Sequence, residues 1–224
     1  MNEIALAGGT SGVGHAFWDA LEAQQAHAYI LLTRKPIDNP KAVVVDYSDV
    51  DALKSVLEAH NVTTIISAIS IADGSSGQAQ LNLIKAADLS TKTKRFLPSE
   101  FGADYTPDVD VARHVMYMLD LPTWGETNFF VGERLTINEF AAMSGEVLGK
   151  FKVSCDTIED LIAGKVTMLP AYGPPSEPLI SFFSSLYLLS TKGYFDVDAA
   201  KRENSQVSSM KSIKIKDVIE AWKD

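Results

Sequence analysis

Gly8-Gly9-Thr10-Ser11-Gly12-Val13-Gly14 is the stretch that decides the fold. It follows the apolar run Ile4–Ala7 and opens a segment, 15–25, whose apolar residues recur at helical spacing. A strand, a glycine-rich turn and a helix in this order are typical of dinucleotide binding. Glycines let the backbone approach a pyrophosphate closely, and the helix N-terminus favours its negative charge. An ordinary glycine-rich turn is the alternative, but the position at the first strand-to-helix turn favours the dinucleotide.

Apolar strands alternate with amphipathic helices through the first hundred residues. The pattern predicts strands at 3–7, 28–33, 42–45, 63–68 and 94–98, helices at 15–25, 49–60 and 78–89, and a polar loop at 73–77. The strands are apolar throughout rather than alternating, which indicates a parallel sheet covered on both faces. We therefore expect an α/β fold with a Rossmann-type doubly wound parallel sheet.

The second half of the chain is less regular. It predicts helices at 109–121, 136–148, 158–163, 179–190 and 218–222, with short strands at 128–131 and 152–154. Thr136 and Glu139 have the spacing of a capping box. We expect an NAD(P)-binding domain over residues 1–108. A smaller C-terminal α+β substrate lobe over 109–224 is expected to pack with it as one unit.

Charge and cysteine content restrict the partners and the compartment. Lys and Arg number 20 and Asp and Glu 29, a net charge of −9, which argues against nucleic acid or an anionic membrane as the main partner. Cys155 is the only cysteine, and we expect it in the core of a protein kept in a reducing compartment. The apolar run at the N-terminus is too short for a secretory signal. These features predict a cytoplasmic protein.

Two basic residues occupy the position that distinguishes NADP from NAD in dinucleotide-binding folds. In dinucleotide folds, an acid about 20 residues after the glycine motif takes the adenosine ribose, whereas an arginine accepts a 2′-phosphate. Here that position holds Arg34, preceded by Thr33 and followed by Lys35. Two cations at a strand end fit a phosphate dianion, so the sequence favours NADP(H) over NAD. The alternative is a solvated surface pair before Pro36.

Further cofactor contacts are expected after the third and fourth strands. Asp46 stands where the adenine edge would pass, although it could instead cap the following helix. Ser67, Ala68 and Ile69 end the fourth strand and would lie beside the nicotinamide ribose, because ligands bind at the carboxyl ends of parallel strands.

Other chemical motifs do not fit. The four histidines lack metal-ligand spacing, so no metal site is predicted. There is no phosphate-binding Gly-Lys-Ser/Thr motif and no nucleophile elbow. No tyrosine is followed four residues later by lysine, so the acid/base pair of classical short-chain dehydrogenases is absent. The catalytic residues stay unknown at this stage.

The string Arg95-Phe96-Leu97-Pro98-Ser99-Glu100-Phe101-Gly102 resembles the NmrA-like / isoflavone-reductase-like family of atypical short-chain dehydrogenases, in particular its fungal NmrA-like members. The helix segment Leu83–Ala87 and the stretches Phe130–Phe140 and Leu161–Lys165 are also similar to that family. Gly8–Gly14 and Arg34-Lys35 fall where the family has its pyrophosphate loop and NADP phosphate site. The predicted cofactor-binding set is Gly8, Gly9, Thr10, Ser11, Gly12, Val13, Gly14, Thr33, Arg34, Lys35, Asp46, Ser67, Ala68, Ile69, Ser99 and Phe101.

The chain departs from the family pattern after this string. A family member would continue with a catalytic-lysine helix, a further strand and a substrate loop, but here 109–121 follows almost at once and resembles a later helix. We therefore expect an internal deletion near residues 104–108, from an incorrect gene model, a splice form or a shortened protein.

The resemblance implies an NADPH-dependent oxidoreductase with a small-molecule substrate. The alternative is a non-catalytic NAD(P)-sensing regulator with a protein partner, for which a nuclear location would also fit.

Overall fold

The computed structural model describes residues 3–10, 12–70, 74–101, 108–126, 128, 130–149, 152–169, 173–194 and 212–221. The chain forms two compact units, Met1–Trp124 and Gly125–Asp224.

The first unit is built on a five-stranded parallel sheet. Its strands are β1 (Glu3–Ala7), β2 (Ala28–Thr33), β3 (Ala42–Val44), β4 (Thr64–Ser67) and β5 (Arg95–Leu97), in the order β3-β2-β1-β4-β5. All four neighbouring pairs run parallel. The strand order therefore reverses between β1 and β4, which is where a doubly wound sheet binds its ligand. The predicted doubly wound parallel sheet is confirmed.

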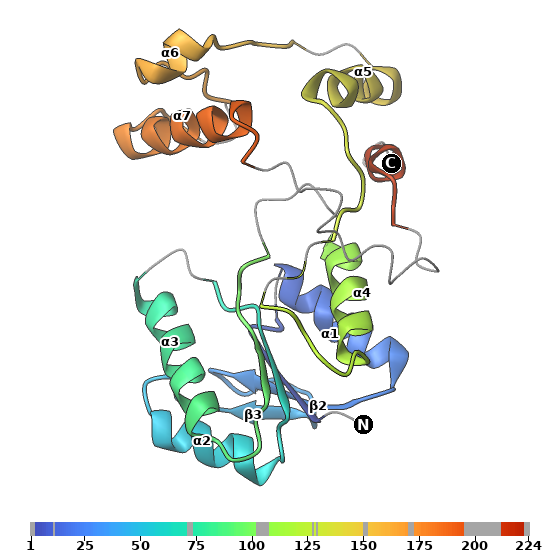
Figure 1. Cartoon of the computed structure of the whole chain (residues 1–224), viewed down its shortest axis with the longest axis vertical. Coiled ribbons are helices and arrows are strands. Elements are labelled where there is room, and N and C mark those ends of the chain that lie inside the picture. The colour runs from blue at the N-terminus through green and yellow to red at the C-terminus, as the bar shows by residue number, and fades with distance from the viewer. Residues whose placement is uncertain are drawn as a thin grey trace. The chain divides into compact units, whose positions relative to one another are not determined.

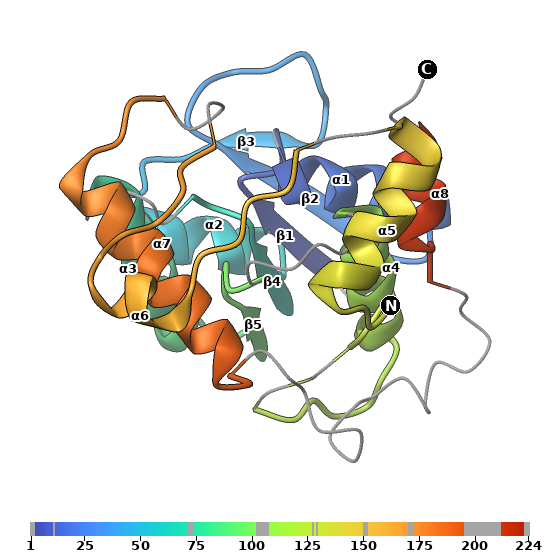
Figure 2. The same cartoon turned by 90° about the horizontal axis from the view of Figure 1, so that it is seen from above.

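Helices cover both faces of this sheet (Figures 1 and 2). On one face α1 (Gly12–Gln24) packs against α4 (Asp108–Leu119), and on the other α2 (Val50–Ala59) packs against α3 (Gly74–Leu89). Each helix therefore has one face on the sheet and one neighbouring helix.

The alternation of side chains along β1 divides the core into two layers. Ile4 and Leu6 are buried with Phe17 and Leu21 of α1, which lie one helical turn apart. Ala5 and Ala7 point to the opposite face, into the cluster that holds the α2 residues Leu53 and Leu57. Burial of one such large side chain contributes roughly 1.5–3 kcal/mol. The two layers thus fix which face of the sheet each helix covers.

The last turn of α4 is hydrogen-bonded to β5 at the edge of the sheet. Arg95 of β5 donates a hydrogen bond to the carbonyl oxygen of Leu119 at 3.2 Å, and its guanidinium lies 5.1 Å from the Trp124 ring centroid. Trp124 Nε1 in turn donates to the Met118 carbonyl at 2.6 Å. These bonds satisfy carbonyls that a helix leaves unpaired at its C-terminus. The first unit therefore extends to Trp124, beyond the division predicted after residue 108, and the packing of the two parts as one unit stays a prediction.

The start of α3 differs from the sequence prediction. A polar loop was expected at 73–77, but residues 74–77 form the first turn of α3. Glycine and serine are tolerated there because the first N–H groups of a helix need no partner within it. Further along, Leu83 and Ala86 anchor the helix in the core.

The second unit is helical in its described residues. Its helices are α5 (Ile137–Leu148), α6 (Ile158–Ile162), α7 (Glu177–Thr191) and α8 (Ile215–Ala221). α5 packs against α8, and α6 packs against α7. The Thr136–Glu139 capping box at the start of α5 is confirmed, because each residue hydrogen-bonds the other's backbone.

Two expectations for this unit are wrong. The described parts of 128–131 and 152–154 are not strands, so the described residues of this lobe show no α+β arrangement. Val153 is exposed, and a short extended segment without a paired neighbour gains no ladder hydrogen bonds. Cys155, expected in the core, is exposed as well.

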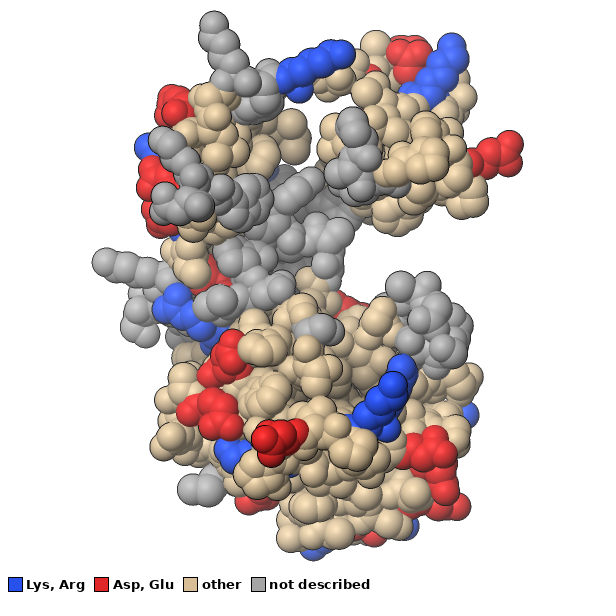
Figure 3. All heavy atoms as spheres, turned by 180° about the vertical axis from the view of Figure 1, so that it is seen from behind, with Lys and Arg blue, Asp and Glu red and all other residues tan. Residues whose placement is uncertain are grey.

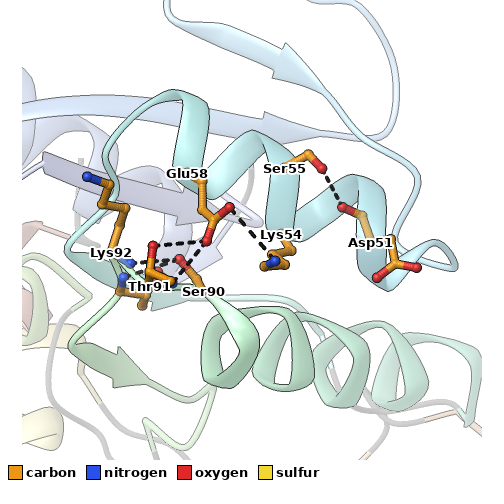
Figure 4. A network of polar contacts seen from close by, with 8 residues as sticks. Asp51, Lys54, Ser55, Glu58, Ser90, Thr91 and Lys92 are labelled. Atoms are coloured by element: carbon orange, nitrogen blue, oxygen red, sulfur yellow. Dashed lines mark hydrogen bonds and ion pairs between the residues drawn. The ribbon is translucent and has the colours of Figure 1, made fainter.

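A polar network joins the end of α2 to the loop before β5 (Figure 4). One carboxylate oxygen of Glu58 accepts hydrogen bonds from the backbone N–H and the hydroxyl of Thr91, at 3.0 and 3.1 Å. The other lies 3.9 Å from Nζ of Lys54. The backbone hydrogen bond is the main reason that the pKa of Glu58 is lower than usual, with smaller contributions from the Thr91 hydroxyl and from Lys54 and Lys92.

We predict that Glu58→Gln destabilises the protein at pH 7 and that this difference disappears in acid. A lowered folded-state pKa means that the carboxylate contributes stability above its ordinary pKa near 4.5. That contribution is lost as the pH falls through the lower folded-state value. Urea unfolding of both proteins from pH 7 to pH 3 measures this. Asp51→Asn, on the same helix, is the control variant, because the hydrogen bond that Asp51 accepts from Ser55 uses its backbone carbonyl and not its carboxylate. Equal profiles for the two variants would contradict the prediction.

Candidate dinucleotide site

The glycine turn joins β1 to α1 by close backbone contacts. Gly8 has φ +81°, and a Cβ at this position would lie 2.5 Å from the carbonyl oxygen of Ala68. A Cβ on Gly14 would lie 2.1 Å from the carbonyl oxygen of Gly8. Only glycine allows both approaches. The turn is thereby pressed against the end of β4, where the Ala68 N–H donates to the Ala7 carbonyl at 2.7 Å.

Of the other residues in the turn, some face the core and some are exposed. Gly9 faces the core, because a Cβ there would lie 2.9 Å from Leu6 Cδ2, and Val13 packs beside the same cluster. Thr10 is exposed. Gly12, the first residue of α1, has φ +53°, and a Cβ on it would meet no atom within 4 Å. Ser11 lies outside the described residues.

This arrangement fits a pyrophosphate. The backbone is open at Gly12, where the free N–H groups of the first turn of α1 favour an anion. The absence of a Cβ at Gly8 and Gly14 lets the turn below this position stay closely packed.

Arg34 lies at a pocket beyond the end of β2. The pocket holds about 560 Å³ and is lined by Arg34, the stretch Val44–Ser48, and Gln78, Ala79 and Asn82. The Arg34 guanidinium is exposed and lies 5.7 Å from the centroid of the Tyr47 ring. Among the described residues, no carboxylate forms an ion pair with Arg34 or Lys35. Lys35 is exposed but does not line the pocket.

Tyr47 forms the buried wall of this pocket. Its hydroxyl donates to the Leu32 carbonyl at 3.1 Å, and its own carbonyl accepts from the Asn82 amide at 2.9 Å. Burial raises the pKa of the Tyr47 hydroxyl far above its usual range, so the group stays neutral. Thr33 is buried, and its carbonyl accepts from the Val45 N–H at 2.8 Å.

Asp46 has a structural role in the turn that follows β3. One carboxylate oxygen accepts from the Ser48 N–H at 2.8 Å and from the Ser48 hydroxyl at 2.7 Å. These bonds, chiefly the one from the hydroxyl, hold the pKa of Asp46 below its usual range. Asp49, not Asp46, caps α2. Asp46 is exposed and lines the pocket, so its predicted contact with the adenine edge stays a prediction.

Gln80 connects the ends of β4 and β5. Its buried side-chain oxygen accepts from the Ser67 hydroxyl at 2.8 Å and from the Ser99 N–H at 2.9 Å. Ser67, predicted beside the nicotinamide ribose, and Ser99, predicted to bind the cofactor, therefore both use polar groups within the protein. Ile69 is buried in the core layer under α2 and α3.

Phe101 packs into the opposite core layer. Its ring centroid lies 4.9 Å from that of Phe17 in α1. Of the residues predicted on the nicotinamide side, Ala68 has its backbone directly against the glycine turn. A cofactor contact of Phe101 stays a prediction.

Sequence reasoning missed Tyr47, Gln78, Gln80 and Asn82. A signal for two of them is present, because Gln78 and Asn82 stand one turn apart near the start of a helix that follows a central strand, and Gln78 donates to Asn82 at 2.9 Å. Tyr47 follows a strand directly. Nothing local marks Gln80, whose partners come from two different strands.

The described residues contain no cluster of three potential metal ligands. On the face shown in Figure 3, acidic and basic side chains are interspersed over the first unit, and the described residues there form no extended basic region. No helix in the described part of the chain is long and apolar enough to cross a membrane.

Comparison with known proteins finds sequence similarity to an oxidoreductase and to an isoflavone reductase homolog. No protein-family model matches it. Oxidoreductase BOA1 of Botryotinia fuckeliana is 42% identical over 119 residues, which cover 50% of this chain and 40% of that protein. Isoflavone reductase homolog A622 of Nicotiana tabacum is 25% identical over 192 residues, covering 81% of this chain and 56% of that one. The predicted likeness to isoflavone reductases is confirmed.

This isoflavone-reductase-like chain thus spans about half the length of the curated relatives it matches. The predicted deletion near residues 104–108 falls almost entirely outside the described residues and stays a prediction.

Solved structures confirm the Rossmann-type fold. NADPH-dependent quinone oxidoreductase QOR2 of Escherichia coli, complexed with NADPH, aligns with a TM-score of 0.71 at 15% identity, covering 99% of this chain and 100% of that chain. At this identity, the likeness concerns the fold alone.

We predict that Gly14→Ala abolishes NADPH binding and strongly destabilises the first unit. Its Cβ would lie 2.1 Å from a backbone oxygen, which cannot move without opening the turn. Gly12→Ala is the matched control, since its Cβ meets no atom and only the positive φ costs about 1–2 kcal/mol. Urea unfolding and NADPH fluorescence titration measure both variants. A Gly14→Ala protein as stable as Gly12→Ala would contradict the close contact.

Proposed function

We propose that this chain binds NADP(H) through its first unit. Two features together carry the proposal. A close-packed glycine turn follows β1, and Arg34, directly after β2, lines a pocket. The pyrophosphate would lie over Gly12 and the N-terminus of α1, and the adenosine would enter the pocket beside Tyr47. Structures of the same fold that are complexed with NADPH support the choice of this cofactor.

Arg34 would take the 2′-phosphate. Within the described residues it contacts the Tyr47 ring, and such an exposed cation–π contact contributes about 0.5–1 kcal/mol. A hydrogen bond to a charged group contributes about 1.5–3 kcal/mol. Arg34 would therefore interact more strongly with the phosphate than with the Tyr47 ring. Lys35 does not line the pocket and would add mainly long-range attraction.

We further propose that the chain is related in activity to NADPH-dependent oxidoreductases that act on a small-molecule substrate. When bound, NADPH would supply the hydride, and the protein would position it and supply a proton. The names of its sequence relatives, an oxidoreductase and an isoflavone reductase homolog, support this class of reaction.

The alternative is a non-catalytic NADP(H) sensor with a protein partner. One observation favours it: Gln80 already holds the Ser67 hydroxyl and the Ser99 N–H. These two groups are therefore occupied within the protein, which agrees with the predicted loss of the lysine segment. A sensor needs only that the dinucleotide bind two states of the protein unequally.

We predict that NADPH binds about 10- to 100-fold more tightly than NADH. One charged hydrogen-bonded contact to the 2′-phosphate, through Arg34, accounts for a difference of this size. Fluorescence titration with both cofactors measures it. Arg34→Ser should remove most of the preference, whereas the control Lys35→Ser should remove little, because Lys35 does not line the pocket. Equal affinities for NADPH and NADH in the unaltered chain would contradict the assignment.

We predict little oxidation of NADPH by this chain. The physical reason is the predicted loss of the catalytic-lysine segment, together with the hydrogen bond to Gln80 that already occupies the Ser67 hydroxyl. Absorbance at the NADPH band, followed with a panel of carbonyl and enone compounds, measures it. Binding without turnover supports the sensor, whereas steady turnover supports the oxidoreductase and contradicts this prediction.

A further inference from the structure

The ring of Tyr47 restricts the side chain of Arg34, the cation on which the proposed NADP(H) site depends. The guanidinium carbon lies over the ring, 5.7 Å from its centroid. Arg34 is exposed and forms no ion pair within the described residues. An exposed arginine side chain samples many rotamers and loses this freedom when it binds a ligand. Contact with a fixed ring removes part of that freedom beforehand.

The ring of Tyr47 is itself held firmly. Its hydroxyl donates to the Leu32 carbonyl at 3.1 Å, and the backbone carbonyl of Tyr47 accepts from the Asn82 amide at 2.9 Å. The residue is 7% exposed and belongs to the core cluster under α2 and α3. β2 and α3 therefore fix the ring, and the ring gives the Arg34 side chain a rigid surface on which to lie.

Contact with the ring is compatible with binding of a phosphate. A guanidinium is planar: it packs on an aromatic ring through its face, whereas its N–H donors point outward in its plane. The ring of Tyr47 therefore leaves the donors of Arg34 available to phosphate oxygens.

A carboxylate that lines the same pocket has other partners. One oxygen of Asp46 accepts from the N–H and the hydroxyl of Ser48, at 2.8 and 2.7 Å. An ion pair between Asp46 and Arg34 would neutralise the cation, but no such pair forms in the described part of the chain. The positive charge of Arg34 stays available to an anionic ligand.

We propose that Tyr47 is a positioning residue that strengthens the preference for NADPH over NADH. The inference rests on the proposed NADP(H) binding. The ring holds the Arg34 guanidinium at the pocket before the cofactor arrives, so less rotamer freedom is lost when the 2′-phosphate binds. NADH lacks this phosphate, so the effect falls on NADPH alone.

Fluorescence titration of full-length variants with NADPH and with NADH tests the proposal. Tyr47→Met replaces the ring by a flexible side chain that adapts to the space. It should lower the ratio of NADPH affinity to NADH affinity about 2- to 10-fold, the effect of one side chain that must be immobilised. Tyr47→Phe keeps the ring and should keep the ratio. General damage to the pocket would lower both affinities and leave their ratio the same.

Two controls separate positioning from a structural effect. Tyr29 is also buried and has a cation over its ring, with Lys41 Nζ 3.9 Å from the centroid, but it does not line the pocket. Tyr29→Met should therefore leave the ratio unchanged. In an Arg34→Ser background, Tyr47→Met should have no further effect on the ratio, because the ring acts through Arg34. Tyr47→Leu is the second ring-free variant, to be used if Tyr47→Met does not fold.

Three results would overturn the proposal. A ring-free variant with the unaltered ratio would show that the ring has no part in cofactor choice. A higher ratio would show that the ring competes with the phosphate for Arg34. An equal loss in Tyr47→Phe would assign the effect to the hydroxyl. Equal affinities for NADPH and NADH in the unaltered chain would contradict the proposed cofactor itself, and this inference with it.

Discussion

The first unit depends on the backbone contact between Gly8, Gly14 and Ala68. Side chains at either glycine would overlap backbone atoms, so the end of β1, the start of α1 and the end of β4 can meet only because these two residues have no Cβ. That contact places the N-terminus of α1 at the point where the strand order reverses. The close approach of the turn to β4 and the position of the candidate anion site therefore depend on the same steric condition.

Helix α3 stabilises the rest of the candidate site through two amides. Asn82 holds the carbonyl of Tyr47 at the wall of the pocket, and Gln80 holds Ser67 and Ser99 at the ends of two strands. The same bonds that order the site also occupy the Ser67 hydroxyl and the Ser99 N–H.

The fold was largely predictable, and the candidate site only in part. Continuous apolar strands and the glycine spacing predicted the parallel sheet, because both depend on local sequence. The start of α3 was missed, since serines and glycines suit a first helical turn as well as a loop. Exposed Cys155 was placed in the core because a free cysteine usually packs as a small buried residue, but its neighbour Val153 is itself exposed.

The sequence by itself determined the order of strands and helices, the glycine turn and the cation at position 34. Only the tertiary structure decided which polar groups are already paired. Ser67 is 13 residues from its partner Gln80, Tyr47 is 15 from Leu32, and Asn82 is 35 from Tyr47. The two glutamine and asparagine contacts form because α3 packs on the sheet, and the Tyr47–Leu32 contact forms because β3 pairs with β2. Local sequence patterns therefore reveal the type of each side chain but not whether it is free to bind a ligand.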